Sequence, residues 1–155
     1  MNNEIKNIIN CINKEQNTNY TIEDFPDKIN EIDWYYISKY KNLSEEFIEK
    51  YKDNVHWNII SKYQDLSEVF IEKHKNKLNW YFISKHQKLS YPFIEKHKNK
   101  LNWCFISKHQ KLSYPFIVKF KDYLDWNIIK EKYNLTYFDI CKYINFDNNK
   151  ISLNI

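Results

Sequence analysis

The sequence of 155 residues contains no glycine, no alanine and no arginine. Without glycine, neither the G-x-S-x-G turn that presents a nucleophilic serine nor a glycine-rich phosphate loop is possible. Without arginine, the chain lacks the side chain that dominates recognition through paired hydrogen bonds. Lysine and asparagine abound instead. This bias indicates an AT-rich genome, so part of the lysine excess reflects codon use.

Cysteine is rare, and its spacing predicts neither a disulfide nor a metal site. Cys11, Cys104 and Cys141 are an odd number and form no C-x-x-C motif, which favours a reducing compartment. No apolar run approaches the ~20 residues that span a bilayer, and the polar start lacks the pattern of a signal peptide. We therefore expect a soluble, cytoplasmic protein that contacts no membrane.

What the chain does contain is a tandem repeat, marked by five tryptophans spaced 23 residues apart. Each tryptophan is followed at fixed distances by isoleucine, leucine and then Ser or Thr, and four units also contain Phe-Ile. A period of this length is typical of stacked solenoids. The tryptophans are Trp34, Trp57, Trp80, Trp103 and Trp126, and the phenylalanines are Phe47, Phe70, Phe93 and Phe116.

Two short helices fit each unit. The second is expected to begin at Ser44 and its equivalents, followed by acids or by proline, which a first helical turn accommodates. The spacing of Phe47, Tyr51 and Val55 is helical. The first helix is expected to begin at an Asp or Asn whose side chain accepts from free N–H groups, with His56 as the exception. These predicted caps are Asp33, Asn79, Asn102 and Asp125.

The turns need a substitute for glycine, and asparagine tolerates left-handed backbone geometry. Asn76 and Asn99 are the expected positions. A leucine-rich repeat is the alternative fold, but the stretch from Ile37 to Leu43 lacks its L-x-L strand motif. We therefore predict an all-α solenoid of five two-helix units, with the repeated tryptophans and phenylalanines in its core.

The two ends of the repeat series are expected to differ from its middle. Residues 1–32 are predicted to form a degenerate capping repeat, with Tyr20 and Thr21 in the Leu-Ser position. Residues 33–146 hold the five repeats, and residues 147–155 form a polar tail.

Two of the units are almost identical, which indicates a recent duplication. Residues 74–94 and 97–117 differ only where Tyr81 is replaced by Cys104. Units that are copied so freely are expected to present a surface rather than to house a single catalytic centre.

The repeated histidines, serines and glutamates are not expected to be catalytic or to bind a metal. His74 and His97 stand where other units have tyrosine or phenylalanine. His86 and His109 stand where others have tyrosine, so all four are interpreted as packing residues, with no carboxylate repeating beside them. The serines cap or lie within helices, and the glutamates are followed by lysines, as on a solvated face. We predict no enzyme activity, no metal and no cofactor.

Nucleic acid is an alternative partner, because two lysine positions recur and exposed tyrosines between them could stack on bases. The net charge of +4 is too mild to argue for it, and the interspersed glutamates, the absence of arginine and the codon-use explanation of the lysines argue against it. Binding would be weak and salt-sensitive. The repeated lysines are Lys39, Lys62, Lys85 and Lys108, and Lys52, Lys75, Lys98 and Lys121.

Protein binding is the function that the sequence favours. Positions that vary between units are expected to face outward, and tyrosine is enriched in interfaces. The predicted partner is a protein or peptide bound along the array. The predicted contact residues are Tyr35, Tyr81, Tyr91, Tyr114, Gln87 and Gln110.

The unit W-x-x-I-S-K-x-x-x-L-S-x-x-F-I-E-K, present at Trp57–Lys73 and Trp80–Lys96, resembles tandem repeats of giant, mimivirus-like DNA viruses. The resemblance covers about residues 33–146. It implies a viral protein in the host cytoplasm that acts on a host or viral partner, and it assigns no functional residue.

Overall fold

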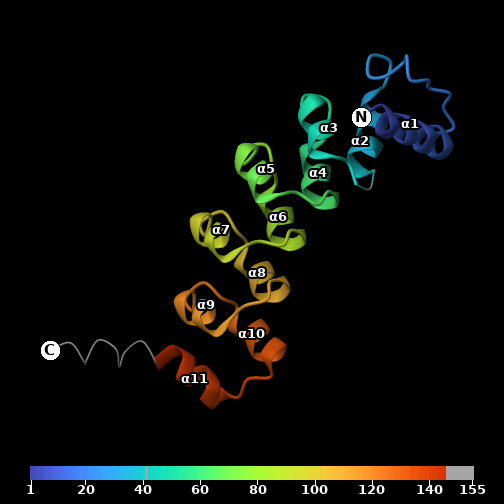
Figure 1. The fold of residues 1–155 in the computed structure, drawn as a ribbon. Helices are drawn as coiled ribbons and strands as arrows, with labels where there is room; N and C mark the ends of the chain where they lie inside the picture. Colours follow the sequence, from blue (N-terminus) through green and yellow to red (C-terminus); the bar gives the residue numbers. More distant parts are fainter. Residues whose placement is uncertain (41, 146–155) are drawn as a thin grey trace. The chain divides into compact units, whose positions relative to one another are not determined.

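The regular structure is entirely helical. The computed structural model describes residues 1–40 and 42–145, in which eleven helices and no strand occur (Figure 1). This confirms the helical interpretation, and none of these helices is long and apolar enough to cross a membrane. The predicted polar tail, residues 147–155, lies outside the described residues. The helices are α1 (Asn2–Gln16), α2 (Glu31–Lys39), α3 (Glu45–Lys50), α4 (Trp57–Tyr63), α5 (Glu68–Lys73), α6 (Trp80–His86), α7 (Tyr91–Lys96), α8 (Trp103–His109), α9 (Tyr114–Lys119), α10 (Trp126–Tyr133) and α11 (Tyr137–Asn145).

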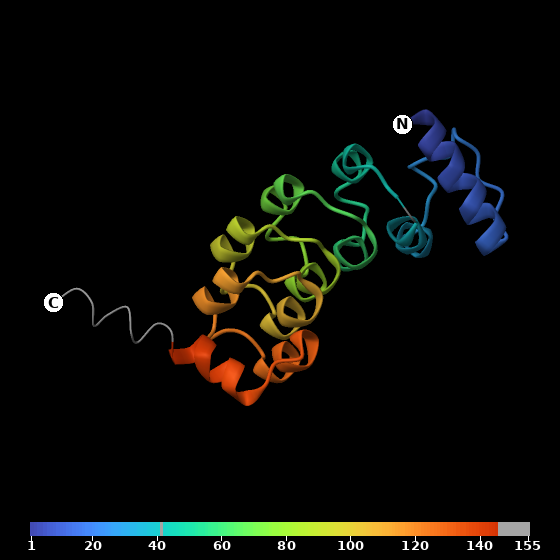
Figure 2. The ribbon, with the colours of Figure 1, turned by 60° about the horizontal axis from the view of Figure 1, so that its bottom comes forward.

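The chain forms two compact units, residues 1–83 and the residues from Ser84 on, with the boundary inside α6. In the first unit, α2 packs against α1 and α4. In the second, α8 packs against α10, and α9 packs against α11. Figure 2 shows, within the second unit, α8 and α10 in one row and α7 and α9 in another.

Helix α1 makes a contact with the start of α3 that a later second helix repeats. The Glu4 carboxylate accepts hydrogen bonds from the Ser44 N–H and hydroxyl, both at 2.8 Å. Glu45 makes the same pair of contacts with Ser67, at 2.6 and 3.1 Å. Along α1, Ile5, Ile8, Ile9 and Ile12 are buried.

Most of the predicted caps form. The hydroxyls of Ser44 and Ser67 each accept from the N–H three residues later at 3.1 Å. Asn102 and Asp125 cap first helices through their side chains, whereas His56 does not.

The prediction that Asp33 caps the first tryptophan helix is wrong. Helix α2 begins earlier, because the Asn30 side chain accepts from the Asp33 N–H at 2.9 Å. Asp33 is therefore inside the helix, where it is buried and accepts a hydrogen bond from the Tyr20 hydroxyl at 2.7 Å.

The prediction of left-handed turns at Asn76 and Asn99 is also wrong. After each second helix the chain continues in helical turns, with the Lys77 N–H bonded to the His74 carbonyl at 2.9 Å, so no left-handed residue is needed. In the described part of the chain, the residues with positive φ are Asn17, Asn42 and Asn134.

In four of the first helices, a buried serine forms a hydrogen bond with the start of the next repeat. The Ser61 hydroxyl donates to the Trp57 carbonyl at 2.7 Å and accepts from the Asn79 N–H at 2.9 Å. The same hydrogen bond, from a backbone N–H to a serine hydroxyl 18 residues earlier, occurs once more in the first unit and twice in the second. These acceptors are Ser38, Ser84 and Ser107.

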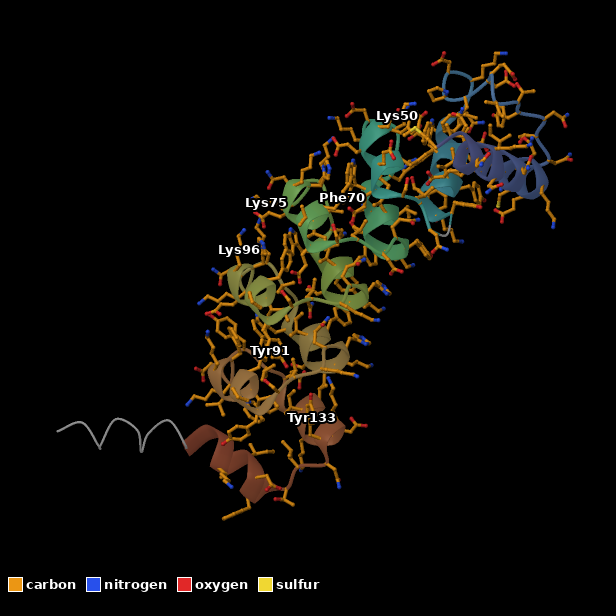
Figure 3. All side chains as sticks on the ribbon, viewed as in Figure 1. Lys50, Phe70, Lys75, Tyr91, Lys96 and Tyr133 are labelled. Carbon is orange, nitrogen blue, oxygen red and sulfur yellow. The ribbon has the colours of Figure 1, made fainter. Side chains whose placement is uncertain are left out.

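The predicted core residues differ in their burial. The four repeated phenylalanines are all buried, and Phe70 lies between α5 and α4, its ring 6.4 Å from that of Trp57 (Figure 3). Trp34 is buried, but the other four tryptophans are only half-buried. Their indole N–H groups each donate to the carbonyl five residues earlier at 2.9 Å. These four tryptophans therefore border the core rather than fill it.

The repeated glutamines require a correction, because Gln64, Gln87 and Gln110 are buried rather than outward-facing. The Gln64 amide accepts from the Leu43 N–H at 2.9 Å and donates to the carbonyls of Ser38 and Tyr40 at 3.0 and 2.6 Å. Such bonds satisfy backbone groups that the ends of short helices leave without intrahelical partners. Gln87 and Gln110 are thus removed from the predicted contact surface.

The last repeat has no glutamine at this position, and two other side chains bond to the backbone of the preceding repeat instead. The Tyr133 hydroxyl accepts from the Leu112 N–H at 2.9 Å and donates to the Leu112 carbonyl at 3.1 Å. Lys132 donates to the carbonyls of Ser107 and Gln110. Helix α10 then ends at left-handed Asn134, and the Leu135 N–H donates to the Lys130 carbonyl at 2.9 Å.

Candidate protein-binding site

An open pocket of about 350 Å³ lies in the first unit and contains one of the predicted contact residues, Tyr35. It brings together α2, the start of α4 and the segment that precedes α6. Its lining residues are Tyr35, His56, Trp57, Asn58, Ile59 and Lys77.

Hydrogen bonds and ring contacts hold the aromatic wall of this pocket in place. The His56 N–H donates to the Ser38 hydroxyl at 2.8 Å, and the Trp57 indole N–H donates to the Lys52 carbonyl at 2.9 Å. The Tyr35 ring meets the His56 ring nearly edge-on, with 5.9 Å between centroids. The wall is therefore formed before any partner binds.

The polar groups of the pocket are mostly donors. Lys77 Nζ lies 5.4 Å from the centre of the Trp57 ring and 3.4 Å from the Asp53 carboxylate. His56 Nε2 lies 3.2 Å from the Glu31 carbonyl, so this nitrogen carries the proton. The six lining residues include one ammonium group and no carboxylate.

A second pocket, of about 310 Å³, lies between α1 and α2 and is lined by Cys11, Glu15, Tyr36, Lys39 and Tyr40. The Cys11 thiol donates to Glu15 Oε1 at 3.7 Å. Burial, together with the Glu15 carboxylate, raises the pKa of Cys11. The thiol is therefore kept protonated, the form in which cysteine is a poor nucleophile.

The four predicted contact tyrosines are exposed, but they occupy two kinds of position. Tyr35 and Tyr81 stand on first helices, whereas Tyr91 and Tyr114 begin the second helices α7 and α9. Tyr91, labelled in Figure 3, also has a structural contact, because its hydroxyl accepts from the Ser113 N–H at 2.6 Å and donates to the Lys111 carbonyl at 2.9 Å. The four tyrosines do not form one row of equivalent residues.

The histidines differ from the sequence interpretation in two respects. His86 and His109 are exposed, whereas His74 and His97 are buried. A carboxylate does lie beside His74, because Glu49 accepts from its Nε2 at 2.7 Å and from Lys73 at 2.9 Å. Among the described residues, no three His, Cys, Asp or Glu side chains form a group that could hold a metal ion.

The Glu49 cluster predicts a specific pH dependence of stability. Hydrogen bonds from Lys73 and then from His74 lower the pKa of Glu49 from its ordinary 4.5 to about 2. A carboxyl whose pKa falls on folding stabilises the protein above its ordinary pKa, and this contribution is lost as the pH falls toward the folded value. We therefore expect Glu49→Gln to flatten the loss of stability between pH 4.5 and pH 2.

Urea unfolding at a series of pH values, followed by circular dichroism, measures this effect. Glu46→Gln, which changes an exposed carboxyl on the same helix, is the control. Equal pH profiles for Glu49→Gln and the unaltered protein would show that the cluster does not stabilise the fold.

Many of the repeated lysines have partners within the chain. The ammonium groups of Lys39, Lys62 and Lys85 lie 5.6, 5.8 and 5.5 Å from the centres of aromatic rings in the following repeat. Lys52 and Lys75 lie 3.6 and 2.8 Å from the carboxylates of Glu49 and Glu72. These lysines cover rings and neutralise acids as well as facing solvent.

The sequence pointed to Tyr35 but not to the residues that surround it in the pocket. Lys77 and Ile59 come from separate segments, and the only signal was His56, which stands where other units have Asp or Asn. Comparisons with protein-family models, with curated proteins and with solved structures find no match to this chain.

Proposed function

We propose that the chain is a tandem-repeat α-solenoid with a period of 23 residues that binds a protein or peptide partner without catalysing a reaction. The support is a hydrogen bond from the backbone N–H that precedes a tryptophan to the serine hydroxyl 18 residues earlier. This bond occurs twice in each compact unit. Repeats that contact only their neighbours build extended binding surfaces in this way.

The observation that carries the binding function is the pocket at Tyr35. It combines aromatic and aliphatic surface with a few polar groups, the composition that recognition sites share. Tyr35 is 39% exposed although it lies in a concave surface. A tyrosine in this position offers a large contact area with little loss of side-chain entropy.

Nucleic acid is the alternative partner that the lysine positions suggest. The ring and carboxylate contacts of these lysines favour a protein partner, because a phosphate backbone would have to compete with them. Titration of labelled oligonucleotides at several salt concentrations tests the alternative, since phosphate contacts give a steep salt dependence.

Photo-cross-linking tests the proposed function. We expect a photoreactive phenylalanine analogue in place of Tyr35 to give a discrete protein adduct in host-cell lysate. The same analogue in place of Val69, which is exposed on α5 outside the pocket, is the control. The resemblance to repeats of giant DNA viruses implies a host or viral protein as the partner.

Adducts at Val69 as abundant as those at Tyr35, or none at either position, would contradict protein binding at this pocket. An adduct that disappears after nuclease treatment would favour the nucleic-acid alternative.

A further inference from the structure

We propose that the pocket at Tyr35 recognises an acidic peptide segment, with a carboxylate bound by Lys77 and Asn58 and an apolar side chain against Trp57 and Ile59. This inference rests on the proposed function and specifies the chemistry of the partner.

The first argument is the hydrogen-bonding capacity that the lining residues retain. The oxygen of the Asn58 amide accepts from Asn79 Nδ2 at 3.0 Å, so its NH₂ group remains as a donor. The Trp57 and His56 N–H groups are already used on carbonyls. The donors that a ligand can reach are therefore the Asn58 NH₂ group, the Tyr35 hydroxyl and the Lys77 ammonium, whose present partner is the exposed Asp53, and this set of donors matches a carboxylate.

The second argument is the position of the Lys77 ammonium over the indole of Trp57. A pocket for a methylated ammonium group needs an aromatic face that is open to the cation. Here the protein's own cation lies over that ring, so a cationic ligand would be repelled. The charge of the site selects against basic segments.

The third argument is the exposure of the group that now neutralises Lys77. The Asp53 side chain is 81% exposed and lies 3.4 Å from Lys77. An exposed ion pair at this distance is weak. A carboxylate from a peptide that is also held by ring contacts can therefore replace Asp53 without breaking a buried interaction.

The size of the pocket indicates a short segment rather than a folded surface. Its volume of about 350 Å³ is near the lower end of the range for ligand sites, roughly 300–1,000 Å³. One apolar side chain and a neighbouring carboxylate fit such a space, with Ile59 and Trp57 providing the apolar wall.

Three labelled peptides test the proposal with the full chain. Each has blocked ends and a central phenylalanine, flanked by glutamate in the first, by glutamine in the second and by lysine in the third. In fluorescence anisotropy we expect the glutamate peptide to bind at least about tenfold more tightly than the others, as opposite charges across an interface require.

Variants of Lys77 identify the group responsible. Lys77→Gln is expected to abolish the preference for the glutamate peptide, and Lys77→Glu is expected to shift it to the lysine peptide. Lys6→Glu, on the exposed side of α1, makes the same charge change away from the pocket and is expected to keep the preference. Circular dichroism of each variant verifies that it is folded.

Selection from a random peptide library separates this inference from the proposed function. Selected peptides that are neutral or basic, and whose binding is lost in Tyr35→Ala, would overturn the acidic preference while leaving peptide binding intact. If no selected peptide depends on Tyr35, both proposals fall. Acidic selected peptides that depend on both Tyr35 and Lys77 support both.

Discussion

Replacing Gln64 with methionine is expected to lower the free energy of unfolding of the first unit by about 3–5 kcal/mol. Methionine fills a similar volume but cannot hydrogen-bond as the amide does. The Leu43 N–H and the Ser38 and Tyr40 carbonyls would then lose their bonds to this side chain, which is only 1% exposed. Urea unfolding followed by far-ultraviolet circular dichroism measures the loss.

Gln16→Met is the matched control for this change. Gln16 is the last residue of α1 and is half-buried rather than enclosed, so we expect its replacement to change the stability by no more than about 0.5 kcal/mol. If the two methionine variants were equally stable, the Gln64 amide would not be a stabilising link between repeats.

Phe70→Ala is expected to destabilise the first unit by about 3–5 kcal/mol, because it removes a large buried side chain and leaves a cavity. Phe70 is 6% exposed, and its ring lies 4.5 Å from that of His74. Its loss also removes the surface against which Trp57 packs. Thermal and urea unfolding, with tryptophan fluorescence as a second probe, measure the effect.

The neighbouring residue supplies a control within the same helix. Val69 is 80% exposed, and Val69→Ala is expected to change the stability by no more than about 0.5 kcal/mol. A small effect of Phe70→Ala, comparable to that of Val69→Ala, would contradict the assignment of the repeated phenylalanines to the core.

Local features of the fold were predictable because they depend on residues a few positions apart. Serine followed by acids or proline locates the start of a second helix, since a hydroxyl can satisfy an N–H three residues later. The helical spacing of Phe47 and Tyr51 likewise predicted which face of α3 is buried. The exception at His56 was visible in the sequence as a missing Asp or Asn.

The burial of the glutamines could not be predicted in this way. The backbone groups that Gln64 satisfies lie 21 to 26 residues earlier in the chain, and no local rule connects them. Variation between units suggested exposure, yet the change from glutamine to Tyr133 keeps a bond to the same backbone position of the preceding repeat. Variation at this position reflects alternative hydrogen-bonding solutions rather than contact with solvent.

The pocket at Tyr35 was only partly predictable for a related reason. Its surface is made by side chains from α2, α4 and the segment before α6. Lys77 reaches the pocket only because the chain returns there after α5. Nothing in the sequence around Lys77 distinguishes it from the other lysines. The charge of this pocket thus comes from a residue that lies far in the sequence from Tyr35.

The ending of the last repeat has a consequence for how the gene can grow. A unit inserted before Trp126 would have the Leu112 N–H on one side and the Tyr133 hydroxyl on the other, so this hydrogen bond between repeats could form again on both sides. A unit appended after α11 would find the Leu135 N–H already bonded within its own turn. This hydrogen bond therefore permits a unit to be added in the interior more readily than after α11, in keeping with the near-identity of residues 74–94 and 97–117.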